Sequence, residues 1–313
     1  MPDSARSIAE LGRRMPVNPA SPAEARARYF NTANAFDMKL PPVPDAVFTE
    51  EPALALAPDA PTGFTACDIS TELACAFPAT TPLVLARYAR IRTGETLTAD
   101  FNATGVLAYV IRGAGSVESG GEALRWAAGD LMLLPGGEAH PWSAEEDAVL
   151  WFVTNEPQLA FDHARAPAPG MAPTDPVHYP AAEIAEQVEL LMRTGRGEEI
   201  PGSALIFSAE RQEATRNALP TLTCAMNALE SGQSQRPHRH NSVAVSLVVQ
   251  GEGCYSVVDG RRKDWAPWAT TITPPVSSHS HHNEGPQRAM FLIVQDGGIF
   301  YHARAMGFEF TDA

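Results

Sequence analysis

Cysteine is scarce in this sequence, and basic residues are outnumbered. The four cysteines, Cys67, Cys75, Cys224 and Cys254, form no CxxC pair. That spacing is poor for a disulfide framework or a zinc knuckle, so we expect reduced, mostly buried thiols. The sequence has 23 lysines and arginines and 37 aspartates and glutamates, which gives a formal net charge of -14. This balance argues against a nucleic-acid partner, because phosphate binding needs a dense basic face.

Long hydrophobic runs are also missing. The first residues, MPDSARSIAELGRRMP, contain no apolar core of the length a signal peptide needs. No later stretch approaches the ~20 apolar residues of a membrane span. We therefore expect a cytoplasmic protein with no membrane partner. Its 313 residues, 44% of them hydrophobic, suffice for two domains or one duplicated domain.

Helical patterns are confined to a few segments. Residues 4–14 and 22–30 have helical spacing, with Ser4 and Ser21 as candidate N-caps. The proline-rich stretch LPPVPDAVFTEEPALALAPDAP predicts irregular chain. A polar connector at 162–180 leads into AAEIAEQVELLMRTG, an amphipathic helix. The rest consists of short apolar runs between glycine and proline turns, which predict strands.

The strand-rich sequence pattern occurs twice with the same internal spacing, and the two copies are offset by 138 to 139 residues. Each half has a glycine, then five other residues, and then two polar residues that are separated by one position. A second glycine lies thirteen positions after the first of these polar residues (113 - 100 and 251 - 238). A repeat of this size indicates a duplicated domain, and many short strands favour a sandwich or jelly-roll barrel in each half. The matching sets are Gly94, Asp100, Asn102, Gly113, Pro135 and His140, and Gly232, His238, His240, Gly251, Pro274 and His279.

The second copy carries a candidate metal site. His238 and His240 lie two residues apart in RPHRHNS, so a strand would place both on one face. His279 follows about 40 residues later, a separation typical of neighbouring strands in a small barrel. Three neutral imidazoles suit a borderline divalent metal and leave positions open for substrate, dioxygen or water. The alternative is that these histidines are polar strand ends on a loop-rich rim.

These motifs resemble those of the cupin superfamily. GQSQRPHRHNSVAVSLVVQG is similar to the first cupin motif, and WAPWATTITPPVSSHSHHN to the second. RPHRHNS, VDGRRKDW, HSHHN and VQDGG most resemble bicupins of the gentisate 1,2-dioxygenase and 1-hydroxy-2-naphthoate dioxygenase group. The resemblance implies an all-β fold of two tandem cupin (double-stranded β-helix, or jelly-roll) barrels with N-terminal and inter-domain helices. The expected division is an arm at 1–82, a cupin at 83–160, a linker with helix at 161–202 and a metal-binding cupin at 203–313.

The two copies differ at the expected ligand positions. Many cupins carry a glutamate four residues after the second histidine, where this chain has Ala244. This fits the three-histidine site of the gentisate-like group, with Fe(II) as the expected metal and Mn, Zn, Ni or Co as alternatives. The N-terminal copy keeps only His140, beside Asp100 and Asn102. These are weak ligands for a transition metal, so we expect that copy to hold none.

Four further residues are candidates for the reaction. His281 shares the parity of His279, and in the resembling family its equivalent lies near the substrate; it would accept or orient a proton, or support a ligand by hydrogen bonding. Arg236 shares the parity of His238 and would clamp a carboxylate or form a rim salt bridge. Gln295 and Tyr255 are candidate substrate contacts, whereas Arg239 should face outward.

The resemblance implies an Fe(II)-dependent, extradiol-type ring-cleaving dioxygenase acting with O2 on a hydroxylated aromatic carboxylate. Gentisate, salicylate and hydroxynaphthoates are the substrates considered, and a homodimer or homotetramer is expected. Two alternatives stay open. One is a metal-dependent lyase or isomerase that does not use O2, and the other is a small-molecule-binding bicupin without catalysis.

Overall fold

The computed structural model describes residues 6–36, 40–194, 197 and 200–311. The chain divides into two compact units, Met1–Pro42 and Val43–Ala313. The described residues of the first unit form short elements, and Arg14 and Tyr29 form an isolated antiparallel bridge there. Its elements are η1 (Ile8–Glu10), α1 (Pro22–Ala25) and α2 (Thr32–Ala35).

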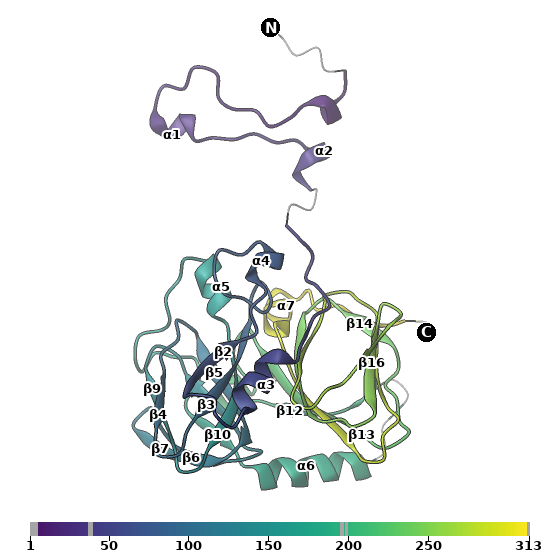
Figure 1. Cartoon of the computed structure of the whole chain (residues 1–313). Helices are drawn as coiled ribbons and strands as arrows, with labels where there is room; N and C mark the ends of the chain where they lie inside the picture. The colour runs from purple at the N-terminus through teal and green to yellow at the C-terminus, as the bar shows by residue number, and fades with distance from the viewer. Residues whose placement is uncertain (1–5, 37–39, 195–196, 198–199, 312–313) are drawn as a thin grey trace. The chain divides into compact units, whose positions relative to one another are not determined.

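The second unit contains two β-barrels (Figure 1). The strands of the first barrel are β2 (Gly63–Ala66), β3 (Leu85–Ile91), β4 (Thr96–Ala99), β5 (Gly105–Arg112), β6 (Ala114–Ser119), β7 (Glu122–Ala127), β8 (Leu131–Pro135), β9 (His140–Ala144), β10 (Ala148–Thr154) and β11 (Val177–Tyr179). Those of the second are β1 (Val47–Phe48), β12 (Ser203–Phe207), β13 (Thr223–Leu229), β14 (His238–His240), β15 (Ala244–Gln250), β16 (Cys254–Val258), β17 (Arg261–Asp264), β18 (Thr270–Thr273), β19 (His279–Asn283), β20 (Ala289–Gln295) and β21 (Phe308–Phe310). The helices are α3 (Glu50–Leu56), α4 (Ser70–Leu73), α5 (Glu156–Phe161), α6 (Ala181–Arg193), η2 (Glu210–Gln212) and α7 (Gly297–Ala303).

The strand order confirms the duplication. One sheet of the first barrel runs β8-β5-β10-β3, and its counterpart in the second runs β18-β15-β20-β13. The other sheets run β4-β9-β6-β7 and β14-β19-β16-β17. The repeated glycines Gly94 and Gly232 both have positive φ, 78° and 77°, in the turns before β4 and β14. Because an L side chain is strained there, glycine recurs at both places.

The two barrels pack against each other through the outer faces of their six-stranded sheets. One continuous apolar core includes Trp151 and Leu133 of the first barrel with Met226 and Leu292 of the second. Polar contacts cross it as well, since the Trp151 Nε1 donates to Thr270 Oγ1 at 2.9 Å. Helix α6 adds Ile184 and Val188 to this core and lies along both barrels (Figure 1). The barrels are therefore held as one body.

Inside, the two barrels differ. The first is filled by apolar side chains, among which Trp142 and Phe152 are fully buried with ring centroids 5.1 Å apart. Asn102 is bound to the chain after α5, accepting from the Ala166 N–H at 2.7 Å. His140 bonds the Pro135 carbonyl through Nε2 at 2.8 Å. This filling supports the expectation that the first barrel holds no metal, which stays a prediction.

Several expected elements differ from the structure. The expected helices at 4–14 and 22–30 are reduced to η1 and α1; Ser21 does cap α1, whereas Ser4 lies outside the described residues. The proline-rich stretch is not wholly irregular, because it contains α3, whose apolar face packs on β2 and β3. The expected helix at 181–195 is confirmed as α6. In the described part of the chain no helix is long and apolar enough to cross a membrane.

Asp296 joins β20 to α7 in a buried position. Its side chain is 4% exposed, and Oδ1 accepts the Val243 N–H at 2.9 Å just before β15. Burial raises the pKa of this carboxyl from 3.8 to about 6, although the Val243 hydrogen bond opposes the shift. The folded protein thus binds this proton more tightly than the unfolded chain. The resulting stabilisation is complete below pH 4 and is lost as pH rises through 6.

We expect Asp296→Asn to stabilise the protein above pH 6, because the amide keeps an acceptor for Val243 without a buried charge. At ~1.4 kcal/mol per pKa unit, the gain in unfolding free energy at pH 7.5 should be on the order of 2–3 kcal/mol and should vanish near pH 4. Urea unfolding of both proteins from pH 4 to 8 measures this. A pH-independent difference between the two proteins would contradict the assignment.

Candidate metal centre

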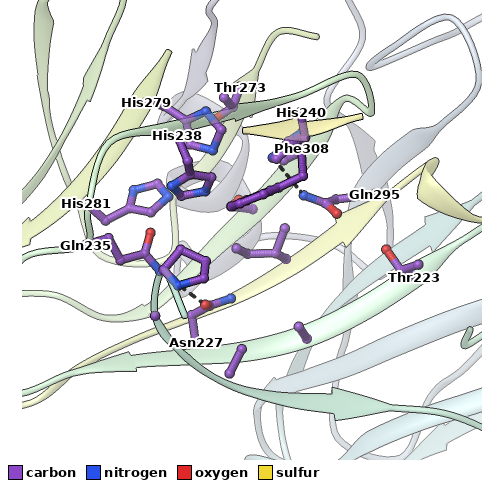
Figure 2. Close-up of a pocket in the computed structure, with 17 residues that line it drawn as sticks. Thr223, Asn227, Gln235, His238, His240, Thr273, His279, His281, Gln295 and Phe308 are labelled. Atoms are coloured by element: carbon purple, nitrogen blue, oxygen red, sulfur yellow. Dashed lines mark hydrogen bonds between the residues drawn. The ribbon is translucent and has the colours of Figure 1, made fainter. Parts of the chain in front are cut away.

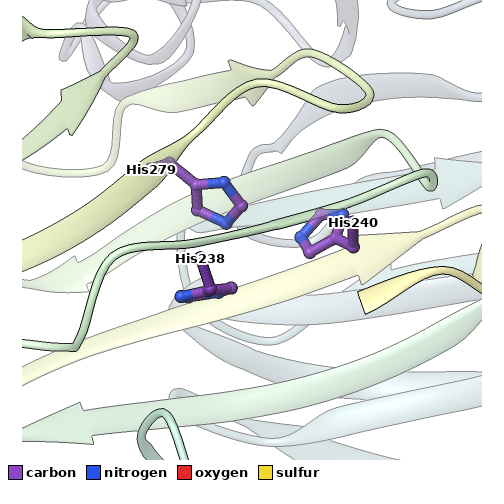
Figure 3. A group of neighbouring side chains, drawn as sticks. All are labelled: His238, His240 and His279. Carbon is purple, nitrogen blue, oxygen red and sulfur yellow. The ribbon is translucent and has the colours of Figure 1, made fainter. Parts of the chain in front are cut away.

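Strand pairing brings three histidines together. In β14 the alternation of the chain buries His238 and His240 and leaves Arg239 exposed, as the sequence predicts. His279 begins β19 and lies directly opposite His238 in the antiparallel pair. One ring nitrogen from each of the three lies within 4.8 Å of the others. Figure 3 shows the three rings facing one another.

The backbone hydrogen bonds of these rings use one nitrogen of each ring and leave the other as the atom that can bind a metal. Each Nδ1 bonds a backbone carbonyl two residues away: His238 with Arg236 at 2.8 Å, His240 with Ser242 at 2.9 Å and His279 with Ser277 at 2.9 Å. A carbonyl oxygen only accepts, so each Nδ1 carries the proton. The lone pair is therefore on Nε2, and the carbonyls fix both tautomer and ring orientation, as is usual for metal-binding histidines.

The three rings are neutral at physiological pH. Burial lowers the pKa of His240 to about 4 and that of His279 to about 3, and it also lowers the pKa of His238. The neighbouring rings add to the shift at His240 and His279. Neutral imidazole is the form that binds a metal. Imidazole binds zinc-like ions at about 2.0–2.1 Å, so the three nitrogens, which lie within 4.8 Å of one another, would move closer together on binding one ion.

His281 is held in the opposite tautomer. It lies two residues beyond His279 on the inner face of β19, and its Nδ1 is 2.7 Å from Ser256 Oγ. Ser256 Oγ also accepts the Trp265 indole N–H at 2.8 Å. Indole only donates, so His281 Nδ1 is the described partner of this hydroxyl that can accept the serine hydrogen, and this arrangement favours the Nε2–H tautomer of the ring. The Nε2 of His281 thus carries a proton, which favours donation of a hydrogen bond over proton acceptance or metal ligation.

These histidines line a cavity of about 200 Å³ inside the second barrel. Gln295, a predicted contact, lies there with its amide nitrogen 3.1 Å from His240 Nε2. Figure 2 shows His281 and Gln235 at one end of the cavity, and Phe308 beside His240. Among the described residues that line it, none is acidic, lysine or arginine. They are Pro201, Gly202, Ala204, Thr223, Ala225, Asn227, Gln235, His238, His240, Ala244, Ser246, Thr273, His279, His281, Ile293, Gln295 and Phe308.

Arg236 does not line this cavity, contrary to the parity argument. Strand β14 begins only at His238, and Pro237 interrupts the alternation before it. Gln235 therefore takes the buried place and Arg236 is exposed, with its guanidinium carbon 4.0 Å from the centre of the Phe310 ring. The predicted carboxylate clamp has no geometric support.

Tyr255 is also outside the cavity. Strand β16 turns Cys254 and Ser256 inward, so Tyr255 lies on the other face. There it stacks on His282 at 4.6 Å between ring centroids and donates to Glu284 Oε1 at 3.0 Å. A substrate contact by Tyr255 thus has no support from the geometry.

The sequence argument missed several cavity residues. Gln235 and Asn227 carry no motif, and Phe308 comes from β21, which pairs with β14 on the edge next to the ligands. Ser256, which bonds His281, was missed as well. A comparison of the two repeats contains a usable signal. At the offset of 138 to 139, the large buried Val106, Leu134 and Trp142 of the first barrel correspond to the smaller or polar residues Ala244, Thr273 and His281.

We expect His238→Ala to abolish stoichiometric metal binding, because the site then has only two imidazoles. Asn102→Ala is the matched control in the first barrel and should keep the metal content of the parent. Elemental analysis of both variants, after reconstitution and desalting, measures the metal bound per chain. Loss of the metal from Asn102→Ala would contradict a single site in the second barrel.

Arg236→Ala should change KM for any carboxylate substrate by less than about twofold, since the guanidinium stacks on Phe310 outside the cavity. Steady-state kinetics measures this. A KM increase of tenfold or more would restore the carboxylate clamp.

Comparisons with known proteins match both barrels. Residues 226–295 match the Cupin domain family, and residues 85–209 match the AraC-like ligand binding domain family. Gentisate 1,2-dioxygenase of Ralstonia sp is 32% identical over 80 residues, covering 26% of this chain and 22% of the relative. The 5-aminosalicylate 1,2-dioxygenase of Comamonas sp is 23% identical over 262 residues, covering 73% and 69%. The 5-nitrosalicylic acid 1,2-dioxygenase of Bradyrhizobium sp is matched over only 43% of its length.

Among solved structures, salicylate 1,2-dioxygenase from Pseudoaminobacter salicylatoxidans, determined as an adduct with gentisate, superimposes with a TM-score of 0.73. The alignment covers 90% of this chain and 88% of that one at 13% identity, which shows a common fold. Taken together with the repeated strand order, these matches identify the chain as a bicupin that is similar in sequence to gentisate and 1-hydroxy-2-naphthoate dioxygenases and shares its fold with salicylate 1,2-dioxygenase.

Proposed function

We propose that this protein is a metal-dependent ring-cleaving dioxygenase for a hydroxylated aromatic carboxylate of the gentisate, salicylate or hydroxynaphthoate type. The observation that carries the proposal is the trio of neutral imidazoles whose Nε2 atoms face one cavity. The relatives named above support it, because their names make them 1,2-dioxygenases of hydroxylated aromatic acids. Fe(II) is the proposed metal, with Mn, Zn, Ni or Co as alternatives, and the extradiol-type label is part of this proposal.

The residues of the cavity have separable roles in this proposal. His238, His240 and His279 would hold the ion, which when bound supplies Lewis-acid and redox chemistry to a chelating aromatic acid and to dioxygen. His281 would donate its Nε2 proton as a hydrogen bond and so orient a substrate oxygen. Gln295, whose amide nitrogen lies against His240 Nε2, would turn to the substrate when that lone pair binds the ion.

Apolar side chains pack around these groups and limit their exposure to solvent. The ring of Phe291 lies 4.6 Å from that of His281, and the Phe308 ring lies 5.3 Å from that of His238. Strand β21 is held over the ligand strand by an Arg239–Glu309 ion pair in addition to its backbone pairing. Polar groups inside such a site act more strongly than in water, because the local dielectric is low.

We propose the same domain division as above, with the metal-binding cupin at 203–313 preceded by an arm at 1–82, a cupin at 83–160 and a linker at 161–202. A homodimer or homotetramer and a cytoplasmic location belong to the same proposal. Two strands cross these boundaries. Strand β1, from the arm, pairs in the sheet of the second barrel, and strand β11, from the linker, pairs in the sheet of the first.

The test is anaerobic reconstitution with Fe(II), followed by oxygen-electrode measurements with salicylate, gentisate and 1-hydroxy-2-naphthoate. Stoichiometric oxygen uptake with loss of the aromatic absorbance is expected with at least one of them. Turnover without oxygen uptake would favour a lyase or isomerase instead. Tight ligand binding without turnover would favour a binding bicupin.

Ser256→Ala should lower kcat/KM about tenfold, because His281 loses the group that fixes its tautomer. Metal content should not change, and Ser256→Thr, which keeps the hydroxyl, should restore most of the activity. Ser280→Ala is the matched control, since the Ser280 hydroxyl bonds the Nε2 of His282, which does not line the cavity. Equal activity losses in the two alanine variants would contradict a specific role for the Ser256–His281 pair.

A further inference from the structure

Gln235 presents an unused hydrogen-bond acceptor in the cavity. Its side chain is 6% exposed and lines the cavity, yet no described residue donates to Oε1. A buried acceptor without a partner typically destabilises a protein by about 1–3 kcal/mol, so natural structures rarely keep one without a use. A ligand that donates to this oxygen would remove that penalty.

The Gln235 amide is held in place from three sides. Its nitrogen donates to Asn227 Oδ1 at 3.3 Å, and its backbone N–H donates to the His281 carbonyl at 2.8 Å. Gly202 lies against the amide, where an added Cβ would come within 2.4 Å of Nε2. With the nitrogen engaged by Asn227, the oxygen points toward the histidine end of the cavity (Figure 2).

The first barrel shows that the fold does not need this amide. At the offset of 138, Gln235 corresponds to Leu97 and Asn227 to Ala89 (235 - 138 and 227 - 138). Leu97 and Ala89 are part of the apolar filling of that barrel. The two amides thus occur only where the barrel is hollow and contains the histidine trio. Their retention there is best explained by a ligand.

We propose that Gln235 is a specificity residue that accepts a hydrogen bond from a hydroxyl or amino substituent on the substrate ring. The inference rests on the proposed function and refines it: the preferred substrate carries a donor in addition to the groups that chelate the metal. His281, whose backbone carbonyl accepts from the Gln235 N–H, would donate from Nε2 to the same end of the cavity. A hydroxyl group fits this pair, because it donates to Gln235 and accepts from His281.

Binding to the zinc-loaded protein tests this without turnover. Isothermal titration calorimetry compares the four dihydroxybenzoates that keep the salicylate 2-hydroxyl (2,3-, 2,4-, 2,5- and 2,6-) with the salicylates fluorinated at the same positions. Fluorine is close to hydroxyl in size but cannot donate. At one position the hydroxyl compound should bind about tenfold tighter than its fluoro counterpart, the effect of one hydrogen bond. Equal affinities at all four positions would overturn the proposal.

Gln235→Met should reduce that preference to less than twofold and leave the fluoro compound's affinity unchanged. Gly202→Ala, which displaces the amide without removing it, should weaken the preference in the same direction. Gln250→Met is the matched control, because Gln250 is exposed and bonds the Arg288 carbonyl outside the cavity. Thermal unfolding and zinc content check that each variant is folded. A preference that survives in folded Gln235→Met would also overturn the proposal.

The two proposals fail in distinguishable ways. Without oxygen uptake by the Fe(II) protein, the dioxygenase proposal fails, whereas the binding preference can still be measured. With oxygen uptake but no preference for a donor, only the role of Gln235 fails.

Discussion

The site depends on a single constraint: three imidazole rings donate their Nδ1 protons to backbone carbonyls two residues away. Those carbonyls belong to the same chain segments as the rings, so the orientation of each Nε2 lone pair is part of the backbone geometry. The pairing of His238 with His279 across β14 and β19 then brings the lone pairs together. Burial keeps the rings neutral, which leaves them ready for a cation. The rest of the second barrel supports this arrangement.

The two barrels show how one fold serves two purposes. Strand order and turn glycines are the same in both, yet the first is solid and the second is hollow. The difference arises from a few side chains, of which Trp142 against His281 and Leu97 against Gln235 are the clearest. Because protein interiors are close-packed, replacing large apolar groups by smaller polar ones opens space that water or a ligand must fill. The solid barrel in turn supports the hollow one through their common apolar core.

Within the cavity, the two histidine tautomers offer different groups. The ligand histidines present lone pairs, whereas the Trp265–Ser256 contact makes His281 present a proton. Gln235 adds an acceptor at the same end. The cavity therefore offers a place for a cation, a donor and an acceptor, in positions set by the pairing of β14 and β16 with β19.

Local periodicity was enough to predict much of this protein from its sequence. Spacing predicts helix α6, the inward faces of His238 and His240 and the outward face of Arg239, because side-chain direction in a strand or helix is a property of the local backbone. The repeated spacing also indicates the duplication, whereas the choice of a barrel over a sandwich came from the resemblance to the cupin motifs. What the sequence could not determine lies where that local rule breaks or where distant segments meet. Pro237 interrupts the alternation, so that Gln235 and not Arg236 takes the buried position. Strand β21 pairs with β14 only in the tertiary fold. The tautomer of His281 depends on Trp265 and Ser256, whose contact exists only after the second barrel has closed.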